Sequence, residues 1–179
     1  VTIANNPILT GNNITFNNTV NGNSNLTVNG GSGGIIFTGA VGTSTIPLGA
    51  IDTNSNGTTS FASTVDAQSL TTKGGTTKLG NNVTTTDSQN YGDAVTLTKN
   101  LTLTGANITF NSTVDGNSPL TVNNNGSLTI AKNLNLNGAF TQKGTGSVAV
   151  SGNITTNNND ISFSGLVTLN APVSFNPGN

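Results

Sequence analysis

The chain has 179 residues, a formal net charge of −1 and only 6% charged residues, whereas ordinary domains contain about 25%. It has no Glu, Arg, His, Cys, Met or Trp. Without a basic stripe or a long apolar run, binding to nucleic acid and a membrane span are not expected, and without Cys the fold needs no disulfide.

Short runs of the form apolar–Thr/Ser–apolar recur along the whole chain. Successive side chains of a strand point to opposite faces, so each run predicts a strand with two apolar residues inside and a hydroxyl outside. The clearest runs are Ile14–Phe16, Leu26–Val28, Ile35–Phe37, Val95–Leu97, Leu101–Leu103, Ile108–Phe110, Leu120–Val122, Leu128–Ile130, Val148–Val150, Ile161–Phe163 and Val173–Phe175.

Asn-Gly dipeptides separate many of these runs. They begin at Asn21, Asn29, Asn56, Asn125 and Asn137, and both residue types tolerate the positive φ of tight turns. No segment shows sustained helical periodicity. The sequence therefore predicts an all-β protein.

The chain also contains a long internal repeat. Residues 1–28 and 95–122 align without a gap, at an offset of 94 positions (95 minus 1), and about two-thirds of the letters are identical. Long-period similarity is typical of stacked architectures. We predict that both copies are equivalent parts of one continuous solenoid spanning residues 1–179.

The finer spacing predicts the coil length. Leu26, Leu48, Leu70, Val95 and Leu120 each open a run after a turn signal, at intervals of 22, 22, 25 and 25 residues. These intervals sum to the long offset, so we expect a parallel β-helix whose coils of about 22–25 residues stack four to a repeat. The alternative is one or more β-sandwiches, with residues 84–93 as a linker before a second domain at Val95.

The rhythm of residues 107–138, NITFNSTVDGNSPLTVNNNGSLTIAKNLNLNG, resembles the repeat regions of large bacterial exoproteins. It is similar to filamentous-haemagglutinin-like adhesins and autotransporter passengers. This resemblance covers most of the chain. It implies a right-handed parallel β-helix that is exported across the outer membrane and serves in adhesion or surface structure.

Catalytic and metal-binding chemistry have little support in the residues present. Without His or Cys the commonest bases and nucleophiles are missing, and the six Asp residues are scattered, with Asp87 and Asp93 expected in a loop around Tyr91. The Gly-rich stretch 30–34 lacks the Asp of calcium-binding β-rolls. We expect no enzyme, no catalytic, cofactor or metal site, and no cofactor.

Asparagine and threonine suggest more specific roles. Asparagines at one corner of successive coils can form hydrogen-bonded ladders, and the repeat suggests the pairs Asn13 with Asn107, Asn17 with Asn111 and Asn23 with Asn117. Solvated loop asparagines are the alternative. Sequons at Asn13, Asn82, Asn107 and Asn153 fit chance in so Asn- and Thr-rich a chain.

Thr96/Thr98 and Thr102/Thr104 could form outward rows of an ice-binding face, although the first repeat has Ala4 and Ile8 at two of these positions. The opening VTIANNPIL lacks the charged and apolar regions of a signal peptide, so the chain is expected to be a mature or excised segment.

The sequence thus predicts an extracellular or cell-surface structural or adhesive solenoid. Its expected partners are other copies stacked end to end, neighbouring repeats of a longer chain, or a cell-surface carbohydrate or protein. The alternatives are a carbohydrate-binding or carbohydrate-cleaving β-helix and an ice-binding solenoid.

Overall fold

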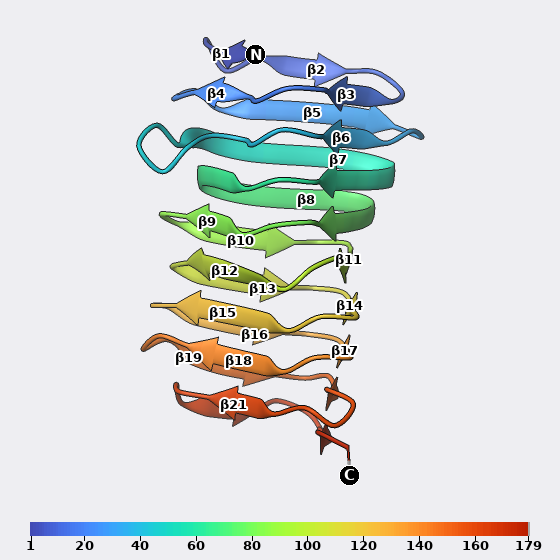
Figure 1. Ribbon diagram of the computed structural model, residues 1–179, viewed down its shortest axis with the longest axis vertical. Helices are drawn as coiled ribbons and strands as arrows, with labels where there is room; N and C mark the ends of the chain where they lie inside the picture. Colours follow the sequence, from blue (N-terminus) through green and yellow to red (C-terminus); the bar gives the residue numbers. More distant parts are fainter. Residues whose placement is uncertain (179) are drawn as a thin grey trace.

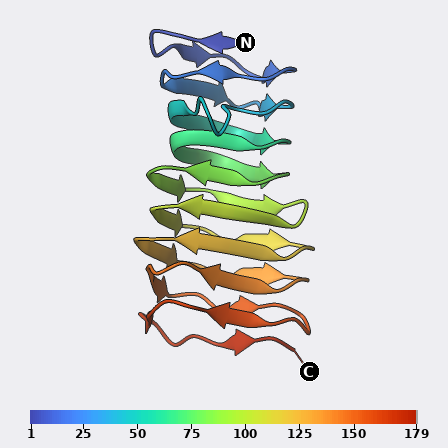
Figure 2. The same ribbon diagram turned by 60° about the vertical axis from the view of Figure 1, so that its left-hand side comes forward.

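The computed structural model describes residues 1–178, and within that range it contains 23 strands and no helix. Every strand pairing is parallel, and 21 strands belong to one continuous ladder. Figures 1 and 2 show the result as a stack of coils, with the two ends of the chain at opposite ends of the stack. The predicted parallel β-solenoid is confirmed. The sandwich alternative is wrong, since residues 83–91 form strands of the stack rather than a linker.

Each coil contributes to three faces, which we call faces 1, 2 and 3. Face 1 contains β3 (Ile14–Phe16), β6 (Ile35–Phe37), β11 (Ala94–Leu97), β14 (Val114–Gly116), β17 (Leu134–Leu136), β20 (Ile154–Thr155) and β23 (Phe175–Asn176). Face 2 contains β1 (Thr2–Ile3), β4 (Asn21–Gly22), β9 (Val83–Thr85), β12 (Leu101–Gly105), β15 (Leu120–Asn124), β18 (Phe140–Lys143) and β21 (Ile161–Phe163).

Face 3 contains β2 (Ile8–Thr10), β5 (Leu26–Gly31), β10 (Ser88–Tyr91), β13 (Asn107–Phe110), β16 (Ser127–Ile130), β19 (Ser147–Val150) and β22 (Val167–Leu169). Two long strands, β7 (Leu48–Phe61) and β8 (Val65–Leu79), bend through all three faces. Gly74 allows one of these bends, because its φ is +104° and a Cβ there would lie 2.1 Å from the Ser55 carbonyl oxygen.

The predicted coil length is wrong. Val95 pairs with Val114 and Val114 with Leu134, which gives coils of 19 and 20 residues, and the other registers fall between 18 and 21 except in one coil. Leu26 pairs with Ile51, 25 positions on, because the loop at residues 38–47 adds residues there and protrudes from the stack (Figure 1). The five residues used as coil markers lie on different faces, so their spacing did not measure a coil.

The long repeat is also not in phase with the coils. The register runs Ile14, Ile35, Thr59, Thr77, Val95 through four coils, and two further faces bring the chain to Ile108. Each strand of the first copy therefore lies one face away from its counterpart: β3 lies on face 1 and β13 on face 3. The two copies are not equivalent parts of the solenoid, although the same side chains point inward in both.

The apolar ends of the runs fill the interior of the stack, which we call the bore. Phe110, Leu120 and Val122 are fully buried, as predicted, and so are Leu26 and Val28, while Phe16 is buried with 5% exposure. Ile14 is only partly buried because no coil covers the N-terminal side of its own coil. The middle Thr or Ser of each run lies on the outer surface or half-buried, as predicted.

Aromatic side chains stack along the bore where successive coils carry them at the same position. Phe16, Phe37 and Phe61 form a column with ring centroids 4.7 and 4.9 Å apart and nearly parallel planes. Tyr91 lies on Phe110 in the same way, at 5.3 Å. This spacing is the distance between parallel strands, about 4.8 Å, so the ladder itself brings the rings into contact.

Candidate functional site

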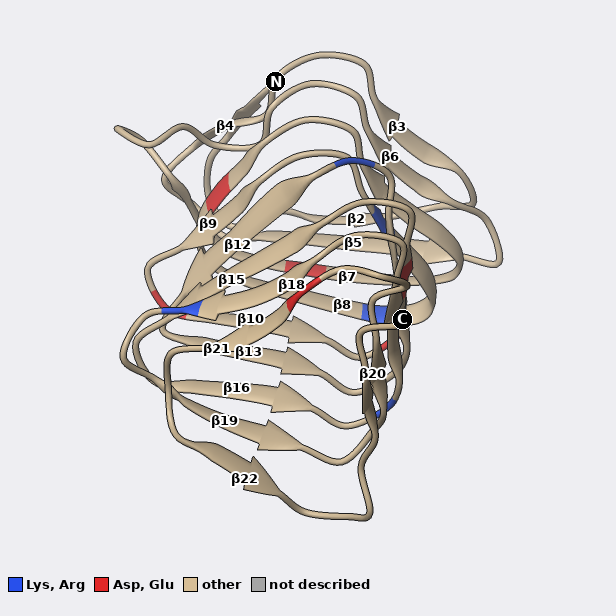
Figure 3. Ribbon diagram, turned by 60° about the horizontal axis from the view of Figure 1, so that its bottom comes forward, with Lys and Arg blue, Asp and Glu red and all other residues tan. Residues whose placement is uncertain are grey.

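The six aspartates are distributed along the stack, as Figure 3 shows for all charged residues. Asp52 lies on β7, Asp66 on β8 and Asp115 on β14. Within residues 1–178 no group of three or more Asp, Glu, His or Cys side chains is placed to hold a metal ion. The acids that the sequence shows as scattered are thus also scattered in space.

Asp93 occupies an unexpected place, inside the bore. It lies between β10 and β11 and is 4% exposed. Its carboxylate accepts hydrogen bonds from the hydroxyls of Thr72 (2.8 Å) and Thr77 (2.9 and 3.0 Å), both buried. Asp93 lies in the bend that follows β10, as expected of a loop residue, but no loop surrounds Tyr91, which is itself a fully buried residue of β10.

A second buried network surrounds Gln89. The Tyr91 hydroxyl donates to its Oε1 at 2.9 Å, and its Nε2 donates to the Thr104 carbonyl at 2.8 Å. Burial, and secondarily the charge of Asp93, raises the pKa of the Tyr91 hydroxyl above its usual value. These partners satisfy polar groups that would otherwise be costly in the bore, so we assign the network a structural role.

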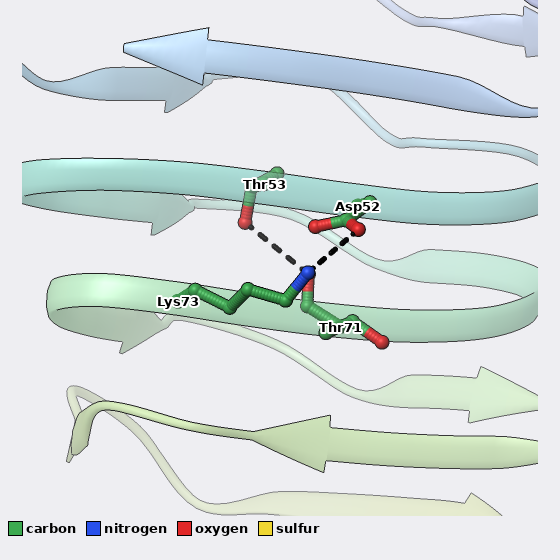
Figure 4. Close-up of polar contacts among 4 residues, drawn as sticks. All are labelled: Asp52, Thr53, Thr71 and Lys73. Carbon is green, nitrogen blue, oxygen red and sulfur yellow. Dashed lines mark hydrogen bonds and ion pairs between the residues drawn. The ribbon is translucent and has the colours of Figure 1, made fainter. Parts of the chain in front are cut away.

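Lys73 and Asp52 form an ion pair on the outer surface, with Nζ and Oδ2 2.9 Å apart (Figure 4). On the inner side of the same two strands, the buried Thr53 hydroxyl points toward the Thr71 carbonyl at 3.5 Å. Both charged side chains are substantially exposed, and exposed pairs contribute little to stability. The pair connects two neighbouring coils and offers no enclosed space for a ligand.

The loop at residues 38–47 borders a small hollow of about 110 Å³ on face 2, where Ser44 and Pro47 lie against Asp66 and Thr84. Partial burial raises the pKa of the Asp66 carboxyl. At the tip, Thr43 and Ile46 exchange two backbone hydrogen bonds of 3.1 Å. The loop is therefore a short, closed turn with Ile46 exposed at its end.

Asparagines do connect successive coils, as the sequence suggested, but many of these bonds join a side-chain oxygen to a backbone N–H instead of joining two amide side chains. At seven positions an Asn stands directly before an inward-facing position, and its Oδ1 accepts the N–H of the corresponding residue one coil later, at 2.8–3.1 Å. The seven are Asn6, Asn13, Asn25, Asn82, Asn107, Asn133 and Asn153.

The three ladder pairs that the repeat suggested are wrong, because repeat partners lie on different faces. Asn13 and Asn107 nevertheless make the same kind of hydrogen bond: the Oδ1 of each accepts the backbone N–H of a residue one coil later, Gly34 and Ser127 respectively. Asn111 pairs with Asn90, and Asn117 with Asn137, instead of with Asn17 and Asn23. The two copies of the repeat therefore share this coil-to-coil hydrogen bond but place it on different faces of the stack.

The same rule explains the sequons. An Asn before the strand, an apolar residue facing inward and a Thr facing outward spell Asn-x-Thr, as at Asn13, Asn82, Asn107 and Asn153. All four side chains are engaged through Oδ1 in the bond to the next coil. The coil pattern therefore produces these motifs without any need for glycosylation.

A second hollow lies on the outside of face 1, over β14, β17 and β20. It measures about 360 Å³, which is within the range of small-molecule sites. Its floor is formed by Gly116 and Leu136. We call it the face-1 groove and define it by its polar lining: Asp115, Asn117, Asn135, Asn137, Thr155 and Asn157.

Side-chain amides connect the walls of the face-1 groove from coil to coil. Asn137 Nδ2 donates to Asn117 Oδ1 at 2.6 Å, and Asn157 Nδ2 donates to Asn137 Oδ1 at 3.1 Å. On the other wall Asn135 Nδ2 donates to Asp115 Oδ1 at 2.9 Å. Each amide in these ladders keeps at least one N–H and at least one lone pair for an outside partner.

Paired threonine rows, which an ice-binding face would need, do not extend along the stack. Thr102, Thr121 and Thr141 align on face 2. The second row passes from Thr104 to Asn123 and then Lys143. The two-row pattern therefore ends after one coil.

No family model, no curated protein and no solved structure matches this chain. Among residues 1–178 there is no helix of the length and apolarity that crossing a membrane requires. What the chain does has to be inferred from its coils and surfaces alone.

Proposed function

We propose that this chain is a structural or adhesive segment of an extracellular β-solenoid protein, without catalysis, in the manner of the adhesin and autotransporter repeats that it resembles. The observation that carries the proposal is the uninterrupted parallel ladder from β2 to β23. Such a ladder makes a rod whose surface repeats at about 4.8 Å along its axis. A rod of this kind supports long, regular surfaces rather than one enclosed cleft.

The placement of the charged residues supports a role without catalysis. Glycoside hydrolysis requires two carboxyl groups about 5–10 Å apart across a cleft. The face-1 groove has a single carboxylate, Asp115, and Asp93 is enclosed in the bore with threonine partners. We therefore favour binding over cleavage for any carbohydrate contact.

The two ends of the stack support further coil-on-coil contact. At the first coil the inward-facing Ile14 is only partly buried, and at the last coil the inward-facing Leu169 and Phe175 are 50% and 39% exposed, because no further coil covers them. The outermost strands also present unpaired backbone groups, which readily pair with another strand. We propose that each end meets another coil, either in a second copy or in a neighbouring repeat of a longer chain.

Small-angle scattering and sedimentation of the purified chain test the rod. About nine coils at 4.8 Å predict an elongated particle about 43 Å long, which lengthens along one axis as concentration rises. A spherical particle would contradict the proposal. End-to-end growth can be separated from non-specific association with Leu169→Lys and Phe175→Lys, which should restore the single-rod length.

Catalysis and location need their own measurements. Incubation with a panel of polysaccharides should release no new reducing ends, and turnover that disappears on changing one Asp would overturn the non-catalytic assignment. In the source cells, protease added to the outside should cleave the chain while the cells remain intact. Full protection under those conditions would contradict an extracellular role.

A further inference from the structure

We propose that the face-1 groove binds a neutral oligosaccharide that lies along the solenoid axis. The inference deepens the proposed adhesive role and rests on it. It assigns the carbohydrate contact to one surface and one chemical class.

The first argument is the hydrogen-bonding character of the groove. Its walls carry amides and a hydroxyl, each able to donate and accept, and one carboxylate. Sugar hydroxyls also donate and accept, so they can replace the water that covers these groups. No lysine lines the groove, and Asp115 would repel a second negative charge. A polyanionic sugar is thereby disfavoured.

The second argument is the rigidity of the lining. The bonds from Asn137 to Asn117 and from Asn157 to Asn137 fix three successive amides, and that from Asn135 to Asp115 fixes the opposite wall. Side chains already held in place lose little entropy when a ligand binds. The free donors and acceptors are therefore set at the spacing of the coils, about 4.8 Å.

The third argument concerns contrast with the rest of the surface. Asn111 and Asn90 form one amide pair of the same kind at 2.8 Å, yet that pair does not line either hollow. The face-1 groove combines a hollow with one amide ladder over three coils and, beside it, an amide–carboxylate pair over two of them. A chain-like ligand can thus contact several rungs at once, and repeated weak contacts add.

The groove contains no aromatic side chain. A sugar ring there would be held by hydrogen bonds alone, so the expected affinity of one chain is low, with a Kd on the order of 1 mM. Tight attachment would then require several grooves on one cell surface.

The experiment is a titration of the ¹⁵N-labelled full chain, followed by NMR, with four separate probes: cellohexaose, maltohexaose, a galacturonic acid hexamer and calcium chloride. We expect at least one neutral hexasaccharide to shift the side-chain amide signals of Asn117, Asn137 and Asn157. Asn137→Ala should weaken that binding by about three- to tenfold, the effect of losing one or two neutral hydrogen bonds.

Matched variants decide between the alternatives. Asn111→Ala, which removes an amide pair outside the groove, should leave binding unchanged. Asp115→Asn keeps the shape and removes the only negative charge of the lining, so it should abolish any shift that calcium chloride causes. Asn157→Ala, at the last rung, provides a second test should Asn137→Ala lower the melting temperature.

Three results would overturn the inference: no shift with either neutral hexasaccharide, shifts confined to residues outside the groove, or shifts with calcium chloride alone that Asp115→Asn abolishes. The last result would make the groove a cation site. None of these outcomes affects the rod measured by scattering, so failure of the groove and failure of the rod can be told apart.

Discussion

Two segments of the stack fill the same bore with different chemistry. In residues 51–93, which we call the polar-bore segment, many inward positions carry hydrogen-bonding side chains, among them Thr53, Ser55, Thr59, Thr72, Thr77, Gln89 and Asp93. In residues 101–150, the apolar-bore segment, the inward positions carry Leu, Ile, Val and Phe, apart from Asn124 and Gln142, which bond to each other at 2.8 Å.

The comparison teaches that the backbone ladder, rather than a particular core composition, defines this fold. Both segments stack in parallel with coils of 18–20 residues. Apolar burial stabilises the second segment directly. In the first segment the buried polar groups must find partners, and most of them do. We expect the polar bore to be more sensitive to lost partners and the apolar bore to lost volume.

The largest effect should come from emptying the apolar bore. Phe110 is fully buried against Tyr91, and Phe110→Ala should lower the free energy of unfolding by about 3–5 kcal/mol, as large-to-small core substitutions do. Thr109→Ala, on the outer face of the same strand, should change it by less than about 0.5 kcal/mol. Equal shifts in denaturant unfolding would contradict the inside–outside assignment.

Breaking the polar bore should have a smaller but definite effect. Asp93→Ala leaves the hydroxyls of Thr72 and Thr77 without their acceptor and should cost about 1–3 kcal/mol in chemical denaturation. Adding Thr72→Val and Thr77→Val should recover most of that loss, because removing both partners of a buried bond is nearly neutral. If the triple variant is less stable than Asp93→Ala alone, the loss in Asp93→Ala does not come from the unsatisfied hydroxyls of Thr72 and Thr77.

Tyr91 lies where the two segments meet, and its ionisation should couple folding to alkaline pH. Its pKa is raised in the folded state, so above the unfolded value of about 10 the unfolded chain releases a proton that the folded chain keeps. Stability should be complete below that pH and fall as pH rises above it.

Because Tyr91 is the only tyrosine, the near-ultraviolet absorbance of phenolate reports this group alone. The signal should appear only as the chain unfolds. Tyr91→Phe should remove this contribution to the alkaline loss and cost about 1 kcal/mol at neutral pH, since Gln89 loses a donor. Phenolate formation in the folded chain would refute the burial of this hydroxyl.

The smallest expected effect is an increase in stability. The Thr59 hydroxyl is buried in the polar bore without a hydrogen-bond partner, and an unsatisfied polar group is unfavourable there. Thr59→Val keeps the shape and should raise stability by about 0.5–1 kcal/mol, measured by thermal unfolding. Thr77→Val is the matched control one coil later, and it should destabilise because its hydroxyl is bonded to Asp93.

The two segments also differ in how well their strands could be predicted from the sequence. In the apolar-bore segment the alternating runs predicted β13, β15 and β16 nearly to the residue. In the polar-bore segment, threonines inside and outside look alike, so β7 and β8 were not predicted. The coil length and the repeat phase failed because an apolar–Thr–apolar run has the same appearance on all three faces.

For the face-1 groove, the Asn-rich composition predicted amide ladders but could not place them. Which amides meet depends on register, and Asn117 is brought to Asn137 by a coil of 20 residues, not by the long repeat. Asp93 was missed for a related reason, since a lone Asp between two strands carries no sequence sign of facing inward. Four asparagines at strand starts, Asn13, Asn82, Asn107 and Asn153, were visible as sequons. Only the parallel register of the coils shows that their Oδ1 atoms accept backbone N–H groups one coil later.

The mismatch between the long repeat and the coil has a consequence for how copies of a motif are displayed. A step of 94 residues carries a motif up the axis and also one-third of a turn around it, as from β3 to β13. In a longer chain with further copies of the repeat at the same 94-residue offset, the copies would follow a helical path around the rod. Every third copy would return to the same face. Lengthening such a chain by duplication would thus present one recognition motif to all sides of the rod, without any change in the motif itself.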